Sequence, residues 1–237
     1  MRIYLITGTS KGLGKALVNE LLNMPDSLVY GYSREQSIFH ENYFHQVIDL
    51  SNPQSLQTFQ FPEIINADSI TLINNAATVQ PIGFLGTLDS NELSQSLHLN
   101  FLTPIVLSNQ FMKLYALFQG RKQIVNIGTG ASTNPYAGWS AYCATKAGLE
   151  MFTKVGNLEQ NSKINGFEFY QIAPGVLDTN MQEQIRNIDE SRFPLKSKFV
   201  SLHDNHQLKS PNLAAQLLLS YLSSDYNTVE CIHRLNL

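Results

Sequence analysis

Cysteine is scarce in this chain, and long apolar runs are missing. The two cysteines, Cys143 and Cys231, form neither a CxxC pair nor a zinc-binding spacing, so the sequence predicts no disulfide framework. No apolar run is long enough to cross a bilayer. The first one has only the length of a strand, too short for the core of a signal peptide. We therefore expect a cytoplasmic protein that does not bind a membrane.

Clusters of like charge are also missing. Charged residues make up 15% of the chain, and the net charge of −3 is spread along it, so no basic patch indicates nucleic-acid binding. The segment His203–His206 contains two histidines and an aspartate, but no further ligands stand at a diagnostic spacing. We interpret it as a polar loop and expect no metal. With 237 residues, 43% of them hydrophobic, residues 1–237 suit one domain with a sizeable core.

Short β-rich runs alternate with helical windows along the chain. This alternation predicts a doubly wound α/β fold, with a mostly parallel sheet of about seven strands and helices on both faces. The expected strands are Ile3–Thr7, Leu28–Tyr32, His45–Asp49, Ser69–Asn74, Gln123–Ile127, Phe167–Ile172 and Val229–His233. The expected helices are Leu13–Asn23, Pro53–Phe59, one long helix Asp89–Phe118, Ser140–Gln160 and Pro211–Leu222.

The least regular stretch runs from Asn180 to Lys209, between the sixth strand and the last helix. It scatters apolar residues such as Met181, Phe193 and Phe199 among many polar ones. A long connection inside a compact domain is usually a lid or a binding loop. We therefore expect residues 180–209 to form a substrate lid.

A glycine-rich turn follows the first expected strand. Its spacing, G-x-x-x-G-x-G, lets the backbone turn tightly and lets a diphosphate approach the positive end of the next helix. A turn of this kind is a weak signal alone, but its place at the first strand–helix junction favours a nucleotide site. The expected cofactor-binding residues of the turn are Gly8, Ser10, Lys11, Gly12, Leu13 and Gly14.

The end of the second strand lacks the acid that usually binds the ribose 2′-hydroxyl of NAD. Ser33 and Arg34 stand there instead, and Arg34 can pair with a 2′-phosphate. Lys11 adds a second positive charge, while Glu35 is a mild counter-indication. These residues favour NADP(H). After the third strand, Asp49 and Leu50 are candidates for contact with the adenine.

Tyr142 and Lys146 are four residues apart in a helical window and so lie on one helix face. A lysine beside a phenol favours the phenolate and suits the tyrosine to acid–base work. The strand before them ends in hydroxyl residues, of which Thr129 and Ser132 can reach a substrate oxygen. The YxxxK spacing alone also fits a surface pair.

The order of these motifs resembles the short-chain dehydrogenase/reductase family over nearly the whole chain. Besides the glycine turn and the Tyr142/Lys146 pair, Asn74–Ala77 follows the fourth strand and Pro174-Gly175 follows the sixth. The resemblance implies a Rossmann-type fold and a nicotinamide-dependent oxidoreductase. Each piece is common, but the combination is specific.

The resemblance also implies roles for residues. Tyr142 would protonate the carbonyl oxygen, Thr129 would orient that oxygen, and Lys146 would bind the nicotinamide ribose and lower the pKa of Tyr142. Asn100 would hold a water in the proton relay. The remaining cofactor contacts would come from Asn75, Ala76, Pro174, Gly175, Val176 and Thr179.

Two segments, residues 134–143 and 174–182, resemble the branch of sepiapterin reductases and bacterial benzil reductases. That branch reduces vicinal dicarbonyls with NADPH. The aspartate that anchors the pterin in sepiapterin reductases has no clear match in residues 229–237, which favours a benzil-like substrate. Threonine replaces the family serine at Thr129, and Ala77 replaces a glycine. The expected substrate-contacting residues are Ser132, Trp139 and Met181, with Tyr136 beside Trp139 in an aromatic wall or in plain core packing.

Three functions stay open at this point. The leading one is an NADPH-dependent carbonyl reductase acting on one carbonyl of a vicinal dicarbonyl. The alternatives are a reductase of an unrelated ketone and a non-catalytic NADP(H)-binding sensor or scaffold, because a fold alone does not fix a function. The partner is a small-molecule carbonyl substrate. By analogy with the family we also expect a homodimer.

Overall fold

The structure, a computed structural model, describes residues 1–224 and 230–236. Its centre is a seven-stranded parallel sheet with the strand order β3-β2-β1-β4-β5-β6-β7. Strands are added toward one edge from β1 to β3 and toward the other edge from β4 to β7. In a doubly wound fold, the ligand crevice lies at this switch point between β1 and β4. The strands are β1 Arg2–Thr7, β2 Ser27–Ser33, β3 Tyr43–Val47, β4 Ser69–Asn74, β5 Arg121–Ile127, β6 Glu168–Ala173 and β7 Ile232–Arg234.

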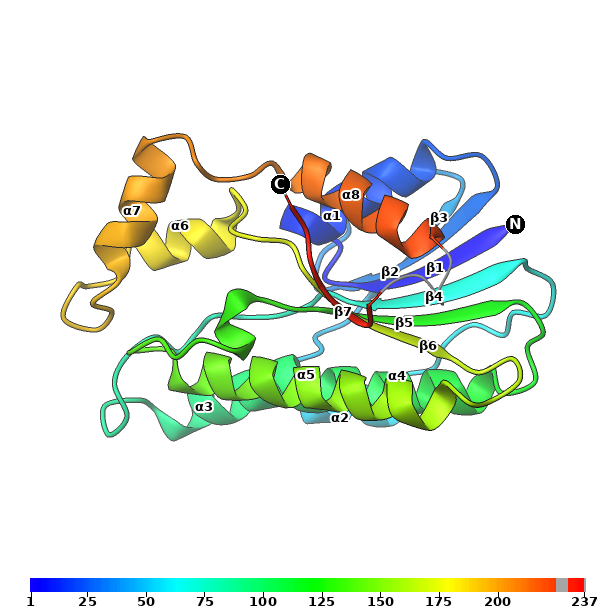
Figure 1. The fold of residues 1–237 in the computed structure, drawn as a ribbon, viewed down its shortest axis with the longest axis horizontal. Coiled ribbons are helices and arrows are strands. Elements are labelled where there is room, and N and C mark those ends of the chain that lie inside the picture. Colours follow the sequence, from blue (N-terminus) through cyan, green and yellow to red (C-terminus); the bar gives the residue numbers. More distant parts are fainter. Residues whose placement is uncertain (225–229, 237) are drawn as a thin grey trace.

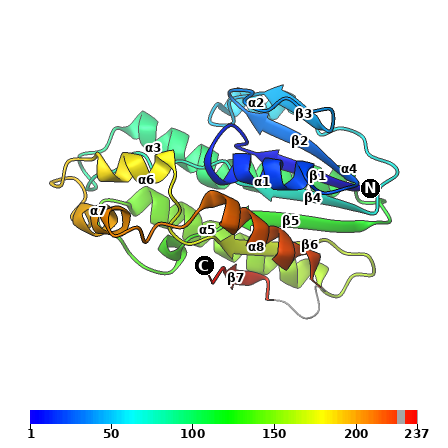
Figure 2. The same cartoon turned by 90° about the horizontal axis from the view of Figure 1, so that it is seen from above.

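Helices cover both faces of this sheet. α1 (Gly12–Leu22) and α8 (Pro211–Ser223) lie side by side on one face, and α2 (Pro53–Thr58), α4 (Thr103–Leu114) and α5 (Ser140–Gln160) cover the other (Figures 1 and 2). A short 3₁₀ turn, η2 (Gly130–Ser132), precedes α5. α6 (Asn180–Arg186) and α7 (Lys196–Asp204) stand apart, beyond the carboxyl ends of the strands (Figure 1).

A separate apolar core fills each side of the sheet. Under α1 and α8, Leu17, Leu21 and Leu218 are fully buried, because positions four apart in α1 face the sheet together. On the other face, Leu107 and Phe111 of α4 are equally buried. Burying one such side chain contributes about 1.5–3 kcal/mol. The two cores make the sheet a fixed platform for the loops at its carboxyl edge.

A chain of buried polar side chains crosses the ends of β4 and β5. Asn74 donates to the side-chain oxygen of Asn126 at 2.9 Å, directly opposite it in the ladder, and to Ser108 at 3.2 Å. Asn126 donates in turn to Thr153 of α5 at 2.9 Å. Buried amides need such partners. This chain ties two strand ends to α4 and α5.

The long helix expected over Asp89–Phe118 is interrupted. It consists of α3 (Ser90–Leu97), a π-helical turn η1 (His98–Leu102) and α4, which ends at Leu114. Asp89 caps α3 by accepting from two backbone N–H groups at 2.9 and 3.0 Å. The π turn shifts the helical register by one residue, a change that the apolar spacing alone does not reveal.

The stretch 180–209 is more regular than expected, because it holds α6 and α7. Their apolar residues follow helical spacing, with Met181, Ile185 and Ile188 on α6 and its end. Leu195, Phe199 and Leu202 do the same along α7. Both helices are short and mostly polar, so their periodicity is easily missed.

The observed strand boundaries differ from the predicted ones by a few residues at most. The third strand is Tyr43–Val47 rather than His45–Asp49, since β3 is an edge strand with an exposed outer side and a weak apolar pattern. The last strand begins at Ile232; residue 229, where we expected it to start, lies outside the described residues. The five other expected strands and the helix Ser140–Gln160 are confirmed within two residues.

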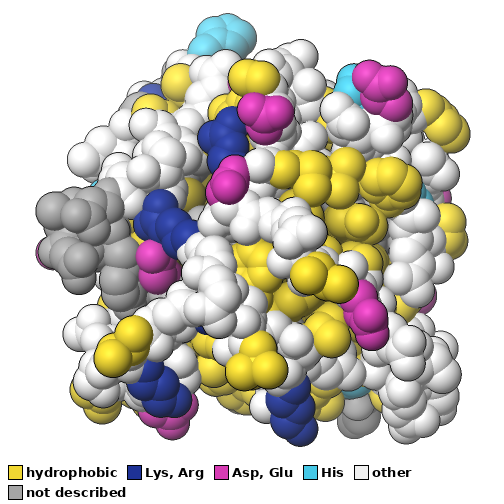
Figure 3. Space-filling view, turned by 90° about the vertical axis from the view of Figure 1, so that its right-hand side faces the viewer, with side chains coloured by type: hydrophobic (Ala, Val, Ile, Leu, Met, Phe, Trp, Pro, Cys, Tyr) yellow, Lys and Arg dark blue, Asp and Glu magenta, His cyan; other side chains and the backbone are white. Residues whose placement is uncertain are grey.

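The amino ends of the strands lie opposite α6 and α7. Figure 3 shows this side, where basic and acidic side chains are interspersed around exposed hydrophobic ones. Among the described residues, no helix is long and apolar enough to cross a membrane. Both cysteines are free.

Candidate active site

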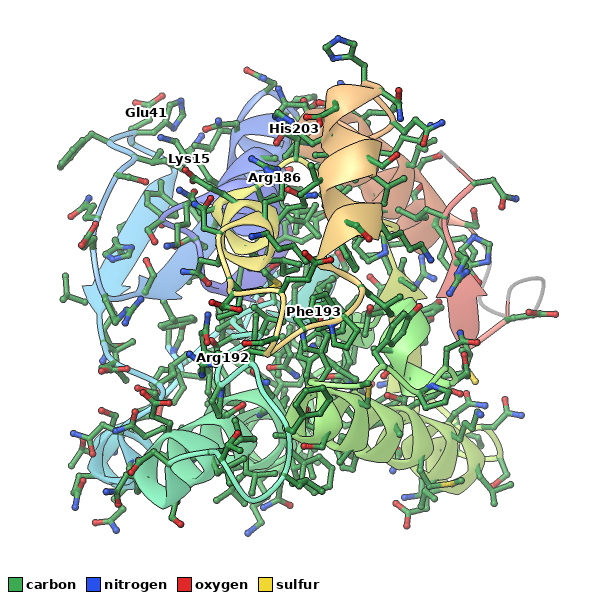
Figure 4. The ribbon with its side chains drawn as sticks, turned by 90° about the vertical axis from the view of Figure 1, so that its left-hand side faces the viewer. Lys15, Glu41, Arg186, Arg192, Phe193 and His203 are labelled. Atoms are coloured by element: carbon green, nitrogen blue, oxygen red, sulfur yellow. The ribbon has the colours of Figure 1, made fainter. Side chains whose placement is uncertain are left out.

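A cavity of about 740 Å³ opens at the carboxyl ends of the strands. Its wall is built from the glycine turn after β1, the ends of β2 to β6, the start of α5 and the α6–α7 segment. Figure 4 views the molecule from this side and shows Arg192 and Phe193 in the loop that joins α6 to α7. Pockets of this size and position bind small ligands in parallel sheets.

The glycine turn has room for a ligand because three of its residues carry no side chain. Gly8 and Gly12 have φ angles of +73° and +56°, in the left-handed region that favours glycine. A Cβ atom at Gly14 would lie 2.1 Å from the carbonyl oxygen of Gly8, so only glycine fits there. The turn thus places the start of α1 against the cavity, and its free N–H groups suit a diphosphate.

Asn75, after β4, fixes this turn from the next strand. Its side-chain amide donates to the carbonyl oxygens of Thr7 and Gly8 at 2.9 and 3.0 Å. The Thr7 hydroxyl accepts in return from the backbone N–H groups of Asn75 and Ala76, both at 3.0 Å. The crevice therefore has a rigid floor, with Asn75 and Ala76 in its wall.

One end of the cavity, at β2 and β3, carries positive charge. The exposed side chains of Lys11 and Arg34 line it, together with Asp49 and Leu50. Burial would raise the pKa of Asp49, but hydrogen bonds from Ser51 and the charge of Arg34 outweigh burial and lower it. Asp49 is thus an anion near neutral pH. These residues fit the adenosine half of a dinucleotide.

Tyr142 and Thr129 meet on the wall of the cavity. Tyr142 is 9% exposed, and both its side chain and that of Thr129 line the cavity. Burial raises the pKa of Tyr142 to about 12, although the Thr129 side chain works in the opposite direction. A phenol with this pKa holds its proton throughout the neutral range. It can therefore donate that proton to an oxygen placed between the two hydroxyls.

Lys146 lies one helical turn away, 4% exposed. Its ammonium donates to the carbonyl oxygen of Ile127 at 2.8 Å and lies 5.9 Å from the centre of the Tyr142 ring. Burial lowers the pKa of Lys146 to about 8. Burial is the largest influence on the pKa of Tyr142, and Lys146 is not among the groups that shift it, which differs from the expectation that Lys146 lowers the pKa of Tyr142.

Most of the predicted site residues line this one cavity, but three do not. Gly14 lies under the turn, packed against Gly8. Ser132 turns away and accepts from Gln171 at 3.3 Å. Asn100 sits in the π turn, where its side chain both accepts from and donates to the backbone of Thr78, each at 2.8 Å. Asn100 thus holds the loop after β4 in place.

The other end of the cavity is aromatic. Trp139 stacks on Phe193 with ring centres 4.6 Å apart, and meets Tyr142 edge-on at 5.5 Å. Tyr136 packs against Trp139 at 5.4 Å. Tyr136 and Trp139 line the cavity, and Trp139 is at the same time packed in the apolar cluster that contains Tyr142 and Phe193.

Several cavity residues escaped the sequence reasoning. Ile185 and Phe199 come from α6 and α7, and the helical spacing of those segments was the signal for them. Arg234 comes from β7, and no local pattern pointed to it. Within residues 1–224 and 230–236, no group of three or more His, Cys, Asp or Glu side chains is arranged to hold a metal ion.

The residues at both ends of the cavity fit a nicotinamide dinucleotide and a carbonyl compound, and comparisons with known proteins agree. Residues 2–190 match the family model for short chain dehydrogenases. The chain is 38% identical to a benzil reductase ((S)-benzoin forming) of Bacillus subtilis over 229 residues, covering 94% of this chain and 93% of the relative. It is 29% identical to the sepiapterin reductase of Rattus norvegicus, covering 94% and 92%.

The fold is shared with solved structures as well. The crystal structure of the KRED1-Pglu enzyme superposes with a TM-score of 0.83 at 24% identity, covering 98% of this chain and 100% of that one. The expected branch, with benzil and sepiapterin reductases, is confirmed. The chain belongs to the short-chain dehydrogenase/reductase family and is an oxidoreductase of carbonyl and hydroxyl groups that uses a nicotinamide cofactor.

Proposed function

We propose that this protein is an NADPH-dependent reductase that converts one carbonyl of a vicinal dicarbonyl into a hydroxyl, giving a hydroxyketone. The observation that carries the proposal is that the hydroxyl side chains of Tyr142 and Thr129 line one cavity, with the ring of Trp139 packed against Tyr142. A proton donor and an apolar aryl site thus lie side by side. The 38% identity to a benzil reductase supports this substrate class.

The chain's own residues have distinct tasks in this reaction. A bound nicotinamide cofactor supplies the hydride. Tyr142 donates its proton to the carbonyl oxygen as negative charge develops there, and its raised pKa keeps that proton available. Thr129 donates a second hydrogen bond to the same oxygen and fixes its position. Lys146, buried beside them, is the cation that stabilises the negative charge that develops as Tyr142 gives up its proton.

Charge at the β2–β3 end of the cavity supports NADPH over NADH. Lys11 and Arg34 line that end, and Ser33 stands where an NAD-binding chain would carry an acid. A guanidinium binds a phosphate through two parallel hydrogen bonds. Glu35 follows directly but does not line the cavity, so it leaves the positive charge in place.

The segment 180–209 is a lid over the substrate in this proposal. The lid loop is docked by contacts that include Phe193, which is fully buried on Trp139. A Cβ at Gly138 would lie 2.6 Å from the backbone oxygen of Arg192, so the loop touches the start of α5 closely. Closing such a loop excludes water while the proton moves.

A homodimer completes the proposal. Met151, Val155 and Leu158 lie on one face of α5, spaced by four and three residues, and are 44–77% exposed. Leu102 and Leu114, at the two ends of the neighbouring α4 segment, are exposed as well. A second copy would cover these side chains. Light scattering after size exclusion should give about twice the 26.6 kDa chain mass.

The test is consumption of NADPH and of NADH with benzil, 1-phenyl-1,2-propanedione and sepiapterin. Turnover of the two diketones with NADPH, and a hydroxyketone product, would support the proposal. Tyr142→Phe is the control for background reduction, because it keeps the ring and removes the proton. NADPH binding without turnover of any dicarbonyl would overturn the proposal in favour of a sensor or a reductase of another ketone.

A further inference from the structure

Arg234 is a cation on the cavity wall for which the cofactor and the proton transfer have no use. It ends β7, the edge strand opposite β3, and so lies at the far side of the sheet from Arg34 and Asp49. Its side chain is exposed, and no hydrogen bond or ion pair joins it to another described residue. A guanidinium stays charged at any physiological pH. This one is available to a ligand.

Gly130, next to the Thr129 hydroxyl, leaves room for that guanidinium because it has no side chain. We call the space over Gly130, beside Arg234 and Tyr136, the anion seat. A Cβ atom at Gly130 would lie 2.7 Å from Nη2 of Arg234 and 3.9 Å from the Tyr136 hydroxyl oxygen. Two hydrogen-bond donors, a guanidinium and a phenol, thus converge over the residue that directly follows Thr129. Any side chain at position 130 would displace one of them.

The charges around this seat leave it positive. Lys198 of α7 lines the same cavity, with its side chain exposed. The acidic residues of the cavity wall are Asp49, which is bonded to Ser51 beyond β3, and Glu92 of α3. Neither forms an ion pair with Arg234. Nothing described therefore neutralises the seat.

We propose that Arg234, assisted by Tyr136, binds a carboxylate on the substrate, so that the preferred substrate is an acidic dicarbonyl. The inference rests on the proposed function. In this proposal the reacting carbonyl of the substrate lies between Tyr142 and Thr129, and the carboxylate of the substrate lies over Gly130. A planar guanidinium matches a carboxylate with two parallel hydrogen bonds, whereas a neutral ketone oxygen gains much less from it. Arg234 is thus a specificity-determining residue.

Binding tests the seat without any need for turnover. Trp139 is the only tryptophan of the chain and lines the cavity, so its fluorescence reports ligand binding. The probes are 1-phenyl-1,2-propanedione and its 4-carboxyphenyl analogue, titrated into the protein with saturating NADP⁺. We expect the carboxylate to bind about fivefold more tightly, a modest factor because Arg234 is partly in solvent.

Four variants then locate the effect. Arg234→Gln should abolish the preference for the carboxylate, and Arg234→Lys should keep part of it, since a lysine keeps the charge without the fork. Lys163→Gln, an exposed lysine outside the cavity, should leave the preference unchanged. Equal affinity of the two probes for the wild type would overturn the proposal. So would a preference that survives Arg234→Gln and disappears in Lys198→Gln.

The turnover arm separates this inference from the proposed function. With NADPH, the ratio of kcat/KM for the carboxylated probe to that for the neutral one should fall about fivefold in Arg234→Gln. If neither probe is reduced but the carboxylate still binds through Arg234, the proposed reaction fails and the anion seat stands. If both are reduced at equal kcat/KM, the reaction stands and the seat fails.

Discussion

Lys146 provides the sharpest test of the electrostatics of this site. Its ammonium is almost fully buried, and the carbonyl oxygen of Ile127 is its hydrogen-bond acceptor. No acidic side chain among the described residues forms an ion pair with it. Burial therefore lowers its pKa from 10.5 to about 8. Because the pKa of Lys146 differs between the folded and the unfolded chain, the free energy of unfolding depends on pH.

The sign follows from proton binding. Between pH 8 and 10.5 the unfolded chain holds the lysine proton while the folded protein has released it, so the free energy of unfolding rises with pH in that window. Below pH 8 both states are protonated, and Lys146 adds no pH dependence. For pKa values of about 8 and 10.5, the increase from pH 7.5 to pH 9.5 is about 2 kcal/mol.

Lys146→Met removes this increase and nearly keeps the side-chain length. We expect the free energy of unfolding of the wild type, minus that of Lys146→Met, to grow by about 2 kcal/mol between pH 7.5 and 9.5. Urea unfolding at the two pH values measures it. Lys154→Met is the matched control, because Lys154 lies on the same helix with an exposed side chain. If the difference in free energy of unfolding between the wild type and Lys146→Met is the same at both pH values, the pKa of Lys146 is not lowered by burial.

The other predictions concern the reaction and the lid. Tyr142→Phe should lower kcat by about 10²–10⁴ while NADPH affinity, measured by fluorescence titration, stays nearly the same; full diketone reduction by this variant would contradict the mechanism. Thr129→Ser should be mild and Thr129→Val severe in kcat/KM, and the reverse order would mean that the hydroxyl is misassigned. Arg34→Ala should reduce the NADPH-to-NADH ratio of kcat/KM by about tenfold, with unchanged ratios arguing for NAD. Hydrogen exchange in residues 180–209 should slow when NADPH and diketone are bound, and unchanged exchange would mean that no lid closes.

The parts of the site that the sequence predicted are local in the chain. The glycine turn needs only the spacing of Gly8, Gly12 and Gly14, and the Tyr142–Lys146 pair needs only helical periodicity. Thr129 could be placed because the carboxyl ends of parallel strands gather at one edge.

The parts that escaped prediction depend on tertiary structure. Arg234 reaches the cavity only because β7 pairs with β6, and no residue near it in sequence marks the site. The pKa of Tyr142 is set mainly by burial of its side chain rather than by Lys146, four residues further along the helix. Helices α6 and α7 are short and polar, so the stability of their segment comes from contacts such as Phe193 on Trp139 more than from helix propensity.

The amide chain from Asn74 through Asn126 to Thr153 also constrains how the protein can fold. A slip of β5 by one residue against β4 would turn Asn126 to the opposite face of the sheet and leave the amide of Asn74 without it. Each buried polar group left unpaired costs about 1–3 kcal/mol. Apolar strands alone would tolerate several registers, whereas these amides select one. These hydrogen-bonded side chains thus favour one alignment of the two strands whose ends line the cavity.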